Sequence, residues 1–192
     1  ILKRGAQVVG VVLRNRRGEL TRILAPNVVV ATGGLGQLYR YTSNPVEADG
    51  SGLALAQQAG AELADLEFVQ FHPTALFHKD IKRFLISESL RGEGAVLVDR
   101  NGRAFMHTYT PQKELAPRDI VTRAIYEEMA EQGVDHLFLD LASHYKGEVP
   151  IKERFSRIYA TCLSGGIDIT REPIPIVPAA HYFCGGVKVD LS

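Results

Sequence analysis

Two short segments of the sequence hold charged side chains suited to acid–base chemistry. The first is Ser87–Gly94, in which Glu88 and Arg91 stand with hydroxyls and a further carboxylate among glycines. Both residues follow an apolar stretch, so at least one of them should be half-buried and should need a partner of opposite charge. A surface turn could have the same composition, and this segment alone leaves both interpretations open.

The second segment contains Arg118, which stands directly after Pro117 in the first turn of a predicted helix. The helix dipole disfavours a cation there by roughly 0.3–1 kcal/mol, although Asp119 beside it softens the effect. A cation held in that place could bind a carboxylate. It could equally form a salt bridge that faces solvent. From this segment alone, the two interpretations are about equally probable.

Histidine and cysteine provide further candidates. His72 lies in a loop that is expected to end a strand, where it could donate a hydrogen bond to a substrate, although a lone histidine is more often structural. His72 and His78 lack the spacing of a metalloprotease pair, and no other residues support a metal site, so the sequence predicts none. Cys184 has no base nearby except His181, and we expect it to be a small buried hydrophobe.

A glycine-rich segment, Ala31–Gly36, follows the apolar run Val28–Ala31. Glycines at the carboxyl end of a strand allow the main chain to approach a ligand closely. A tight turn between a strand and a helix explains the same residues, and the local sequence favours it. The segment is not a Walker loop, because no Gly-Lys-Ser/Thr follows it.

These candidates must be positioned by a mixture of strands and helices. Apolar runs, alternation and turn residues predict the elements, and Pro173–Pro178 is expected to be extended. His72-Pro73-Thr74 is expected to break the strand before it. The predicted strands are 7–13, 20–24, 28–31 (buried on both faces), 65–71, 83–87, 95–99 and 137–141, and the predicted helices are 49–60, 117–133 and 151–163.

Composition narrows the class of protein. The 192 residues include 22 Lys and Arg and 22 Asp and Glu, and this zero net charge argues against a nucleic-acid binder. A hydrophobic fraction of 45% suits a globular protein, and no run approaches the roughly 18 apolar residues of a membrane span. Two cysteines are too few for a disulfide framework, so we expect a cytoplasmic protein. The first residue, Ile1, and a C-terminal strand that stops mid-pattern predict a piece of a longer chain.

Five segments, taken together and in order, resemble the flavoprotein family of fumarate reductases, succinate dehydrogenases and L-aspartate oxidases. Within that family, Leu115–Asp119 and the Cys184-Gly-Gly sequence are most similar to the L-aspartate oxidases. The alternative is the flavoprotein subunit of a fumarate reductase or succinate dehydrogenase. The matching segments are Val30–Gly34, Glu67–Thr74, Ser87–Gly94, Leu115–Val121 and His181–Val187.

The resemblance implies a fold and an activity. The fold is part of a Rossmann-like α/β domain that binds FAD, with an inserted α+β capping domain. Residues 1–65 would belong to the FAD-binding domain, 66–180 to the capping domain, and 181–192 to the return into the first. The activity is oxidation of L-aspartate to iminoaspartate, with the flavin reoxidised by oxygen or fumarate, in NAD biosynthesis. Quinolinate synthase is then a candidate partner, and this piece alone is expected to be inactive and without FAD.

The resemblance also implies roles for individual residues. Arg118 would exchange a proton with the substrate carbon, and Glu88 and Arg91 would relay protons to it. The residues that would hold the dicarboxylate substrate, L-aspartate or fumarate, are His72, Ser87 and His181. The residues that would contact the flavin cofactor are Ala31, Thr32, Gly33 and, in place of an aspartate common in the family, Asp49 or Ser51.

Overall fold

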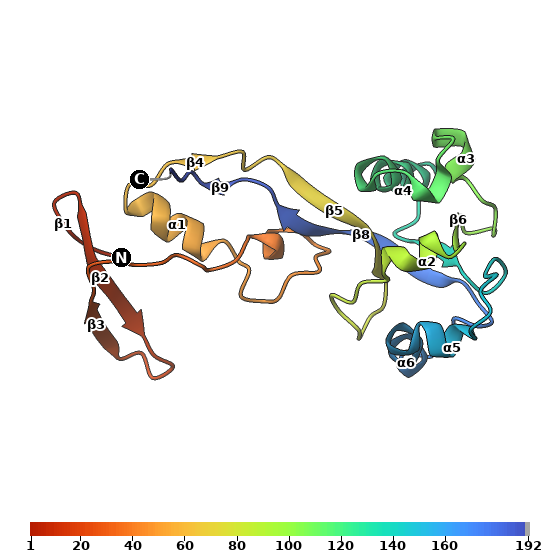
Figure 1. Cartoon of the computed structure of the whole chain (residues 1–192), viewed down its shortest axis with the longest axis horizontal. Coiled ribbons are helices and arrows are strands. Elements are labelled where there is room, and N and C mark those ends of the chain that lie inside the picture. The colour runs from red at the N-terminus through yellow and green to blue at the C-terminus, as the bar shows by residue number, and fades with distance from the viewer. Residues whose placement is uncertain (191–192) are drawn as a thin grey trace. The chain divides into compact units, whose positions relative to one another are not determined.

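The computed structural model describes residues 1–190 and divides the chain into two compact units. Unit 1 consists of Ile1–Leu38, Pro45–Val69 and the chain from Tyr182 onward, and unit 2 consists of Tyr39–Asn44 and Gln70–His181. Figure 1 shows the elements of both units along the chain. Each unit therefore contains segments that are distant in sequence.

Unit 1 combines an antiparallel β-meander with one helix and a short two-stranded sheet. In the meander, Gly10 of one strand lies opposite Leu24 of the next, which confirms the two strands predicted at the start of the chain. The elements are β1 (Leu2–Arg4), β2 (Gln7–Arg14), β3 (Leu20–Leu24), the 3₁₀ turn η1 (Gly36–Leu38), α1 (Ser51–Gln58), and β4 (Leu63–Ala64) paired with β9 (Gly186–Val187). Helix α1 confirms the helix expected over 49–60.

The buried strand predicted for Val28–Ala31 is wrong. The segment has no regular secondary structure, and Val29 is 89% exposed. The sheets of the described residues do not include it, and a β-branched run without a hydrogen-bonding neighbour has nothing to hold it as a strand. Its apolar side chains remain uncovered in this part of the chain.

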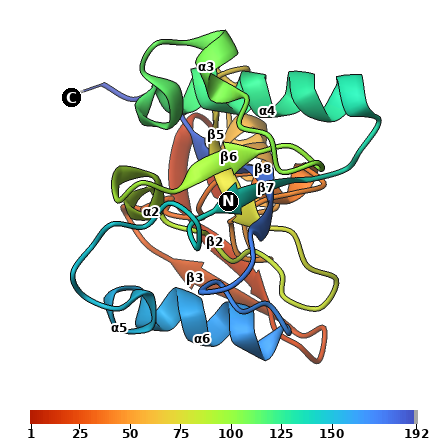
Figure 2. The ribbon, with the colours of Figure 1, turned by 90° about the vertical axis from the view of Figure 1, so that its right-hand side faces the viewer.

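Unit 2 is built on a four-stranded sheet in the order β5, β8, β7 and β6, in which β7 pairs antiparallel with both β6 and β8. Figure 2 looks onto this part, with α3 and α4 on one side of the strands and α5 and α6 on the other. The strands are β5 (Val69–Leu76), β6 (Val96–Val98), β7 (Leu137–Asp140) and β8 (Ile174–Phe183). The helices are α2 (Glu88–Gly92), α3 (Met106–Tyr109), η2 (Lys113–Leu115), α4 (Arg118–Gln132), α5 (Ile151–Arg154) and α6 (Ser156–Ser164).

The hydrophobic core lies in unit 2. Leu97, Leu139 and Ile174 occupy neighbouring register positions on β6, β7 and β8 and are fully buried. Helix α4 covers them with Val121 and Ile125, which are spaced four residues apart, as an amphipathic helix requires. By contrast, the hydrophobic side chains that unit 1 buries among the described residues are only alanines, Ala48 and Ala56.

Three sequence predictions for unit 2 need correction. The strand expected over 65–71 instead runs through His72-Pro73-Thr74 as β5, because an edge strand of a sheet tolerates proline. The strand expected over 83–87 is reduced to one bridge, between Ala75 and Leu85, because α2 begins at Glu88. The helix expected over 151–163 is interrupted at Phe155, which leaves helical geometry (φ −120°, ψ 41°) and buries its ring in the core.

Candidate active site

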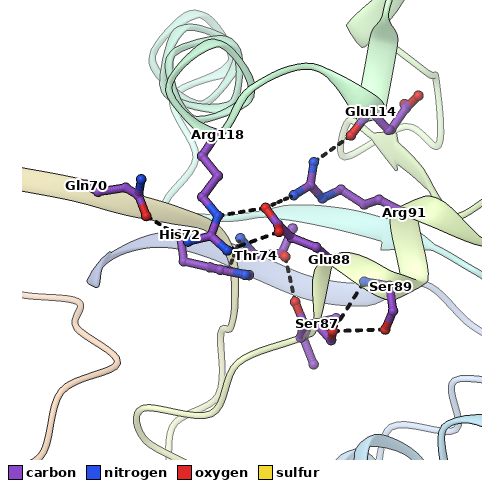
Figure 3. Close-up of polar contacts among 10 residues, drawn as sticks. Gln70, His72, Thr74, Ser87, Glu88, Ser89, Arg91, Glu114 and Arg118 are labelled. Carbon is purple, nitrogen blue, oxygen red and sulfur yellow. Dashed lines mark hydrogen bonds and ion pairs between the residues drawn. The ribbon is translucent and has the colours of Figure 1, made fainter. Parts of the chain in front are cut away.

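The first turn of α4 places Arg118 against the carboxylate of Glu88. Pro117 precedes the helix in an extended conformation, and Arg118 is its first residue. Its Nε donates to Glu88 Oε1 at 2.7 Å and its Nη2 donates to Glu88 Oε2 at 3.0 Å, as Figure 3 shows. This two-point pairing is the geometry in which guanidinium and carboxylate bind most strongly, and the pair is only partly exposed to solvent.

Helix α2 positions Glu88 and Arg91 on one face, three residues apart. Ser87 accepts a hydrogen bond from the main-chain N of Ser89 and so caps the helix. Arg91 Nη2 donates to Glu88 Oε1 at 3.0 Å. The side chain of Arg91 is only 4% exposed, whereas that of Glu88 is 43% exposed. Arg91 therefore lies on the buried side of the carboxylate, which agrees with the expectation that at least one of the two residues is half-buried and paired.

Electrostatics in this cluster favour the charged form of the carboxylate. The hydrogen bonds from Arg118 lower the pKa of Glu88 to about 2. Burial lowers the pKa of Arg91, whose Nη1 donates to the main-chain O of Glu114 at 2.5 Å. Its Nε is buried and has no hydrogen-bond partner among the described residues. The result is one carboxylate shared by two guanidinium groups.

Two histidines complete the site from neighbouring strands. His72 on β5 and His181 on β8 have ring centroids 5.4 Å apart. The main-chain N of Thr74 donates to His72 Nδ1 at 3.2 Å. Burial, followed by the charge of Arg118, lowers the pKa of His72 to about 4 and also lowers the pKa of His181. Both rings are therefore neutral at pH 7 and can donate only one hydrogen bond each.

A cavity of about 210 Å³ lies among these residues. It is smaller than the roughly 300–1,000 Å³ of pockets for drug-sized ligands, so it suits a small molecule. Its walls combine a cation, imidazole donors and a hydroxyl. The lining residues are His72, Leu85, Ser87, Glu88, Arg118 and His181. Of the six catalytic and substrate-binding residues predicted from sequence, only Arg91 lies outside this lining.

The residues predicted to contact a cofactor gather in unit 1. Gly50 N donates to Gly34 O at 3.2 Å, which ties the glycine-rich segment to the start of α1. A side-chain carbon on Gly52 would lie 1.6 Å from Thr32 Oγ1, so only glycine fits there. Asp49 Oδ1 accepts from Ser51 N at 2.9 Å. Beside Gly33, which has φ +75°, the structure leaves open space, so a ligand can approach this main chain.

The two cysteines and His78 lie outside the cavity and show no arrangement that suits catalysis. Cys184 is exposed, not buried as expected, because it lies in the short link between β8 and β9. Cys162 is fully buried, and burial raises the pKa of its thiol to about 11. His78 caps a turn by accepting from the main-chain N of Asp80 and of Ile81. Within residues 1–190 no cluster of three or more His, Cys, Asp or Glu side chains could hold a metal ion.

Sequence reasoning missed three polar residues of this site. Gln70 Oε1 accepts from Arg118 Nη1 at 2.7 Å, and its position two residues before His72 on a strand was a signal that the two share a face. Glu114 supplies the main-chain acceptor for Arg91. Ser43 Oγ lies 2.6 Å from His181 Nδ1, and no local pattern in the sequence could have paired residues so far apart.

Comparison with known proteins identifies the class. The family model described as "FAD binding domain" matches residues 1–192. The chain therefore belongs to the FAD-binding domain family. No helix in the described part of the chain has the length and apolar character needed to cross a membrane.

The curated relatives are more specific. The chain is 52% identical to L-aspartate oxidase 1 of Ralstonia nicotianae and 52% identical to L-aspartate oxidase of Pseudomonas aeruginosa, over 179 residues in each case. Each alignment covers 93% of this chain and 33% of the relative. The chain thus spans about a third of the length of the curated relatives that it matches.

Solved structures match the whole fold. A quinol–fumarate reductase with menaquinol molecules has a TM-score of 0.86 and 37% identity, covering 99% of this chain and 36% of its own. Sdh1 of Mycobacterium smegmatis in complex with UQ1 has a TM-score of 0.77 and 36% identity, covering 96% of this chain and 31% of its own. The described residues are therefore a mixed α/β part of the flavoprotein fold of fumarate reductases.

Proposed function

We propose that this chain is part of an L-aspartate oxidase, which oxidises L-aspartate to iminoaspartate with FAD in NAD biosynthesis. The observation that carries the proposal is the cavity lined by Arg118, Glu88, Ser87, His72 and His181. It occurs in a chain that is 52% identical to L-aspartate oxidases. Quinolinate synthase, which would consume the product, is the candidate partner.

The cavity suits a dicarboxylate for an electrostatic reason. L-aspartate carries two carboxylates. The guanidinium of Arg118 and the imidazole N–H groups can bind both of them, so that no buried charge lacks a partner. Because both histidines are neutral at pH 7, they contribute hydrogen bonds and leave the positive charge to arginine. His72, His181 and Ser87 are therefore proposed to bind and orient the substrate.

Arg118 is proposed to move a proton to or from the substrate. The pKa of an arginine lies far above neutral pH, so it can act this way only if a neighbouring acid returns or removes the proton. Glu88 bonds Arg118 through both its oxygens and bonds Arg91 through one of them. This chain of hydrogen bonds supports Glu88 and Arg91 as the relay.

The glycine-rich segment of unit 1 fits part of a cofactor site. Its main chain is exposed at Ala31–Gly33, with open space beside Gly33, and these residues with Asp49 or Ser51 are proposed to contact FAD. FAD held by these residues would supply the hydride acceptor for the substrate and the route of the electrons to oxygen or fumarate. Unit 1 is accordingly proposed as part of the FAD-binding domain, and unit 2 as the capping domain.

The second candidate function is that of a fumarate reductase or succinate dehydrogenase flavoprotein. The fit to the quinol–fumarate reductase structure, with a TM-score of 0.86, favours it. The same cavity would accept succinate or fumarate, because these are also dicarboxylates. Leu-Ala-Pro-Arg-Asp at 115–119 argues for the aspartate-oxidising branch.

Turnover by the complete enzyme decides between the two functions. The complete protein containing this chain should oxidise L-aspartate in the presence of oxygen, with iminoaspartate trapped or hydrolysed to oxaloacetate, and should oxidise succinate far more slowly. Faster turnover of succinate than of L-aspartate would assign the chain to the second candidate function. No turnover of either substrate by a protein containing FAD would reject both.

A further inference from the structure

The segment Tyr41–Asn44 clamps the end of β8 next to the cavity. Ala180 N donates to Tyr41 O at 2.9 Å, and Asn44 Nδ2 donates to His181 O at 2.9 Å. Thr42 and Ala180 also form a parallel bridge. These bonds hold the main chain on both sides of His181, although the two segments are some 137 residues apart in sequence.

Among the described residues, His181 Nδ1 is the nearest acceptor for the hydroxyl proton of Ser43. Its Oγ lies 2.6 Å from His181 Nδ1 and 3.5 Å from Ala180 O. Ala180 O already accepts from Ser43 N at 3.0 Å and from Thr42 Oγ1 at 2.9 Å. A carbonyl oxygen has two lone pairs, so these two shorter bonds occupy it. This occupancy of Ala180 O favours donation from the Ser43 hydroxyl to Nδ1 of His181.

We propose that Ser43 is a positioning residue that holds the His181 ring with its proton on Nε2, so that this nitrogen donates a hydrogen bond to a substrate carboxylate. The proposal rests on the proposed function for the identity of the substrate, because it names a carboxylate as the acceptor. It does not rest on that function for the state of the ring, which is set by the protein alone.

The other histidine of the cavity has the same arrangement with a different donor. His72 Nδ1 accepts from the main-chain N of Thr74, so its proton must also reside on Nε2 when the ring is neutral. A main-chain donor is fixed by the strand, whereas a hydroxyl can rotate. Because Ala180 O already accepts two shorter hydrogen bonds, it competes weakly for the Ser43 hydroxyl among the described residues.

Nuclear magnetic resonance of the complete enzyme, labelled with ¹⁵N-histidine, tests the ring directly. Long-range ¹H–¹⁵N correlations distinguish protonated from unprotonated ring nitrogens, and His181→Gln assigns the signal. We expect an unprotonated Nδ1 in the wild type and in Ser43→Thr, which retains the hydroxyl. In Ser43→Ala both tautomers should be populated. A protonated Nδ1 in the wild type would overturn the proposal.

Binding of malonate tests the consequence for a carboxylate. Malonate is a dicarboxylate with a single carbon between its carboxylates, so it cannot be dehydrogenated. Its Kd should rise about tenfold in Ser43→Ala, the scale of one lost hydrogen bond to a charged group, and should return to near the wild-type value in Ser43→Thr. The control is Ser164→Ala, which removes an exposed hydroxyl bonded to Thr161 O and should leave Kd unchanged.

The outcomes separate this proposal from the proposed function. A Kd within twofold of wild type in Ser43→Ala would reject the role of Ser43, even if L-aspartate is oxidised. If the wild type binds no dicarboxylate and oxidises none, the proposed function fails, and the ring spectra alone decide the role of Ser43. Should Ser43→Ala not fold, the spectra of the wild type and of Ser43→Thr still decide.

Discussion

Glu88 is the residue on which the charges of the site converge. Its Oε1 accepts from Arg118 Nε and from Arg91 Nη2, and its Oε2 accepts from Arg118 Nη2. Two cations so close to one another would repel without the carboxylate between them. Glu88 therefore permits Arg118 to lie at the wall of the cavity while Arg91 remains buried, and removing Glu88 would leave the buried Arg91 guanidinium without its ion-pair partner.

Replacing Arg118 with lysine in the complete enzyme tests its proposed role. Lysine retains the charge but cannot make two parallel bonds to Glu88. If Arg118 moves a proton, kcat and kcat/KM for L-aspartate should fall together by 100-fold or more, the scale of about 10²–10⁴ that general acid–base catalysis contributes. The FAD content, measured by absorbance, should be unchanged.

Two results would contradict that role. A raised KM with an unchanged kcat would mean that Arg118 only anchors a carboxylate. A kcat close to wild type would remove it from the reaction. The matched control is Arg123→Lys on the same helix, which changes an exposed pair with Asp119 and should stay within the effect of about 0–1 kcal/mol expected of such pairs.

The pH dependence of stability should report on His72. Its pKa falls from 6.5 to about 4 on folding, chiefly because the ring is buried. Between these values the unfolded chain binds more protons than the folded chain, so acidification destabilises the fold. The contribution of His72 is fully present above pH 6.5 and is lost by about pH 4. It amounts to roughly 3 kcal/mol at 1.36 kcal/mol per pKa unit.

Urea unfolding at a series of pH values measures this slope. The His72→Gln variant should lose much of the decline between pH 6.5 and 4 that the wild type displays. An identical decline in both proteins would show that other groups cause it and that the His72 ring ionises readily in the folded state.

Helix α1 requires a glycine in its first turn, where no side chain fits. Gly52 lies in its first turn, where a Cβ would lie 1.6 Å from Thr32 Oγ1. Gly52→Ala should push the glycine-rich segment away from the helix and destabilise the protein by about 1–3 kcal/mol, as overpacking does. In the complete enzyme we expect a lower FAD content than in the wild type.

Gly92 provides a matched control for Gly52. It lies in α2, and a Cβ there would meet nothing within 4 Å, so Gly92→Ala should be neutral or stabilising by up to about 1 kcal/mol. Thermal unfolding and flavin absorbance of both variants test the pair. Equal FAD content in the two variants would mean that contact with Thr32 does not shape the cofactor segment.

The sequence was sufficient for elements that carry their own signals. Pro117 and Gly133 bound α4, and Gly133 adopts the left-handed conformation (φ 62°) that ends a helix. The sequence was insufficient where adjacent strands determine whether a segment forms a β-strand. Val28–Ala31 has the residues of a buried strand but no paired strand in the described part. Strand β5 tolerates Pro73 because it lies at an edge of the sheet.

The same distinction applies to the site. Arg118, Glu88 and the two histidines stand in segments with recognisable motifs, so a resemblance could name them. Ser43 and Glu114 contribute through contacts between segments far apart in the chain. Their types are ordinary in loops, and only the fold reveals that one bonds the ring of His181 and that the other supplies a carbonyl to Arg91.

At the scale of the whole molecule, stability is unevenly divided between the two units. The large buried hydrophobic side chains of the described residues lie in unit 2, whereas unit 1 exposes Leu20, Leu24 and Val29. An open sheet edge and exposed apolar residues favour local opening. Limited proteolysis of the 192-residue chain should therefore cut within residues 1–38 before it cuts within 96–165.

Mass spectrometry of the early fragments identifies the first cuts. A stable fragment that begins beyond residue 38 and retains α4, β7 and α6 is the expected product. Early cleavage inside α4 or β7, with the meander of β1, β2 and β3 still intact, would contradict the uneven distribution of stability.

The hydrogen bond from Cys184 N to Phe68 O, at 3.0 Å, has a consequence for how such a protein can be rearranged. It joins the two chain segments that flank residues 70–181. A short turn between these segments could therefore replace residues 70–181 and leave unit 1 intact. An insertion of this kind can be gained, exchanged or lost as a module during evolution or in the laboratory. The exception is Tyr39–Asn44, which would lose its partner on β8, so a designer who exchanges the module must exchange these six residues with it.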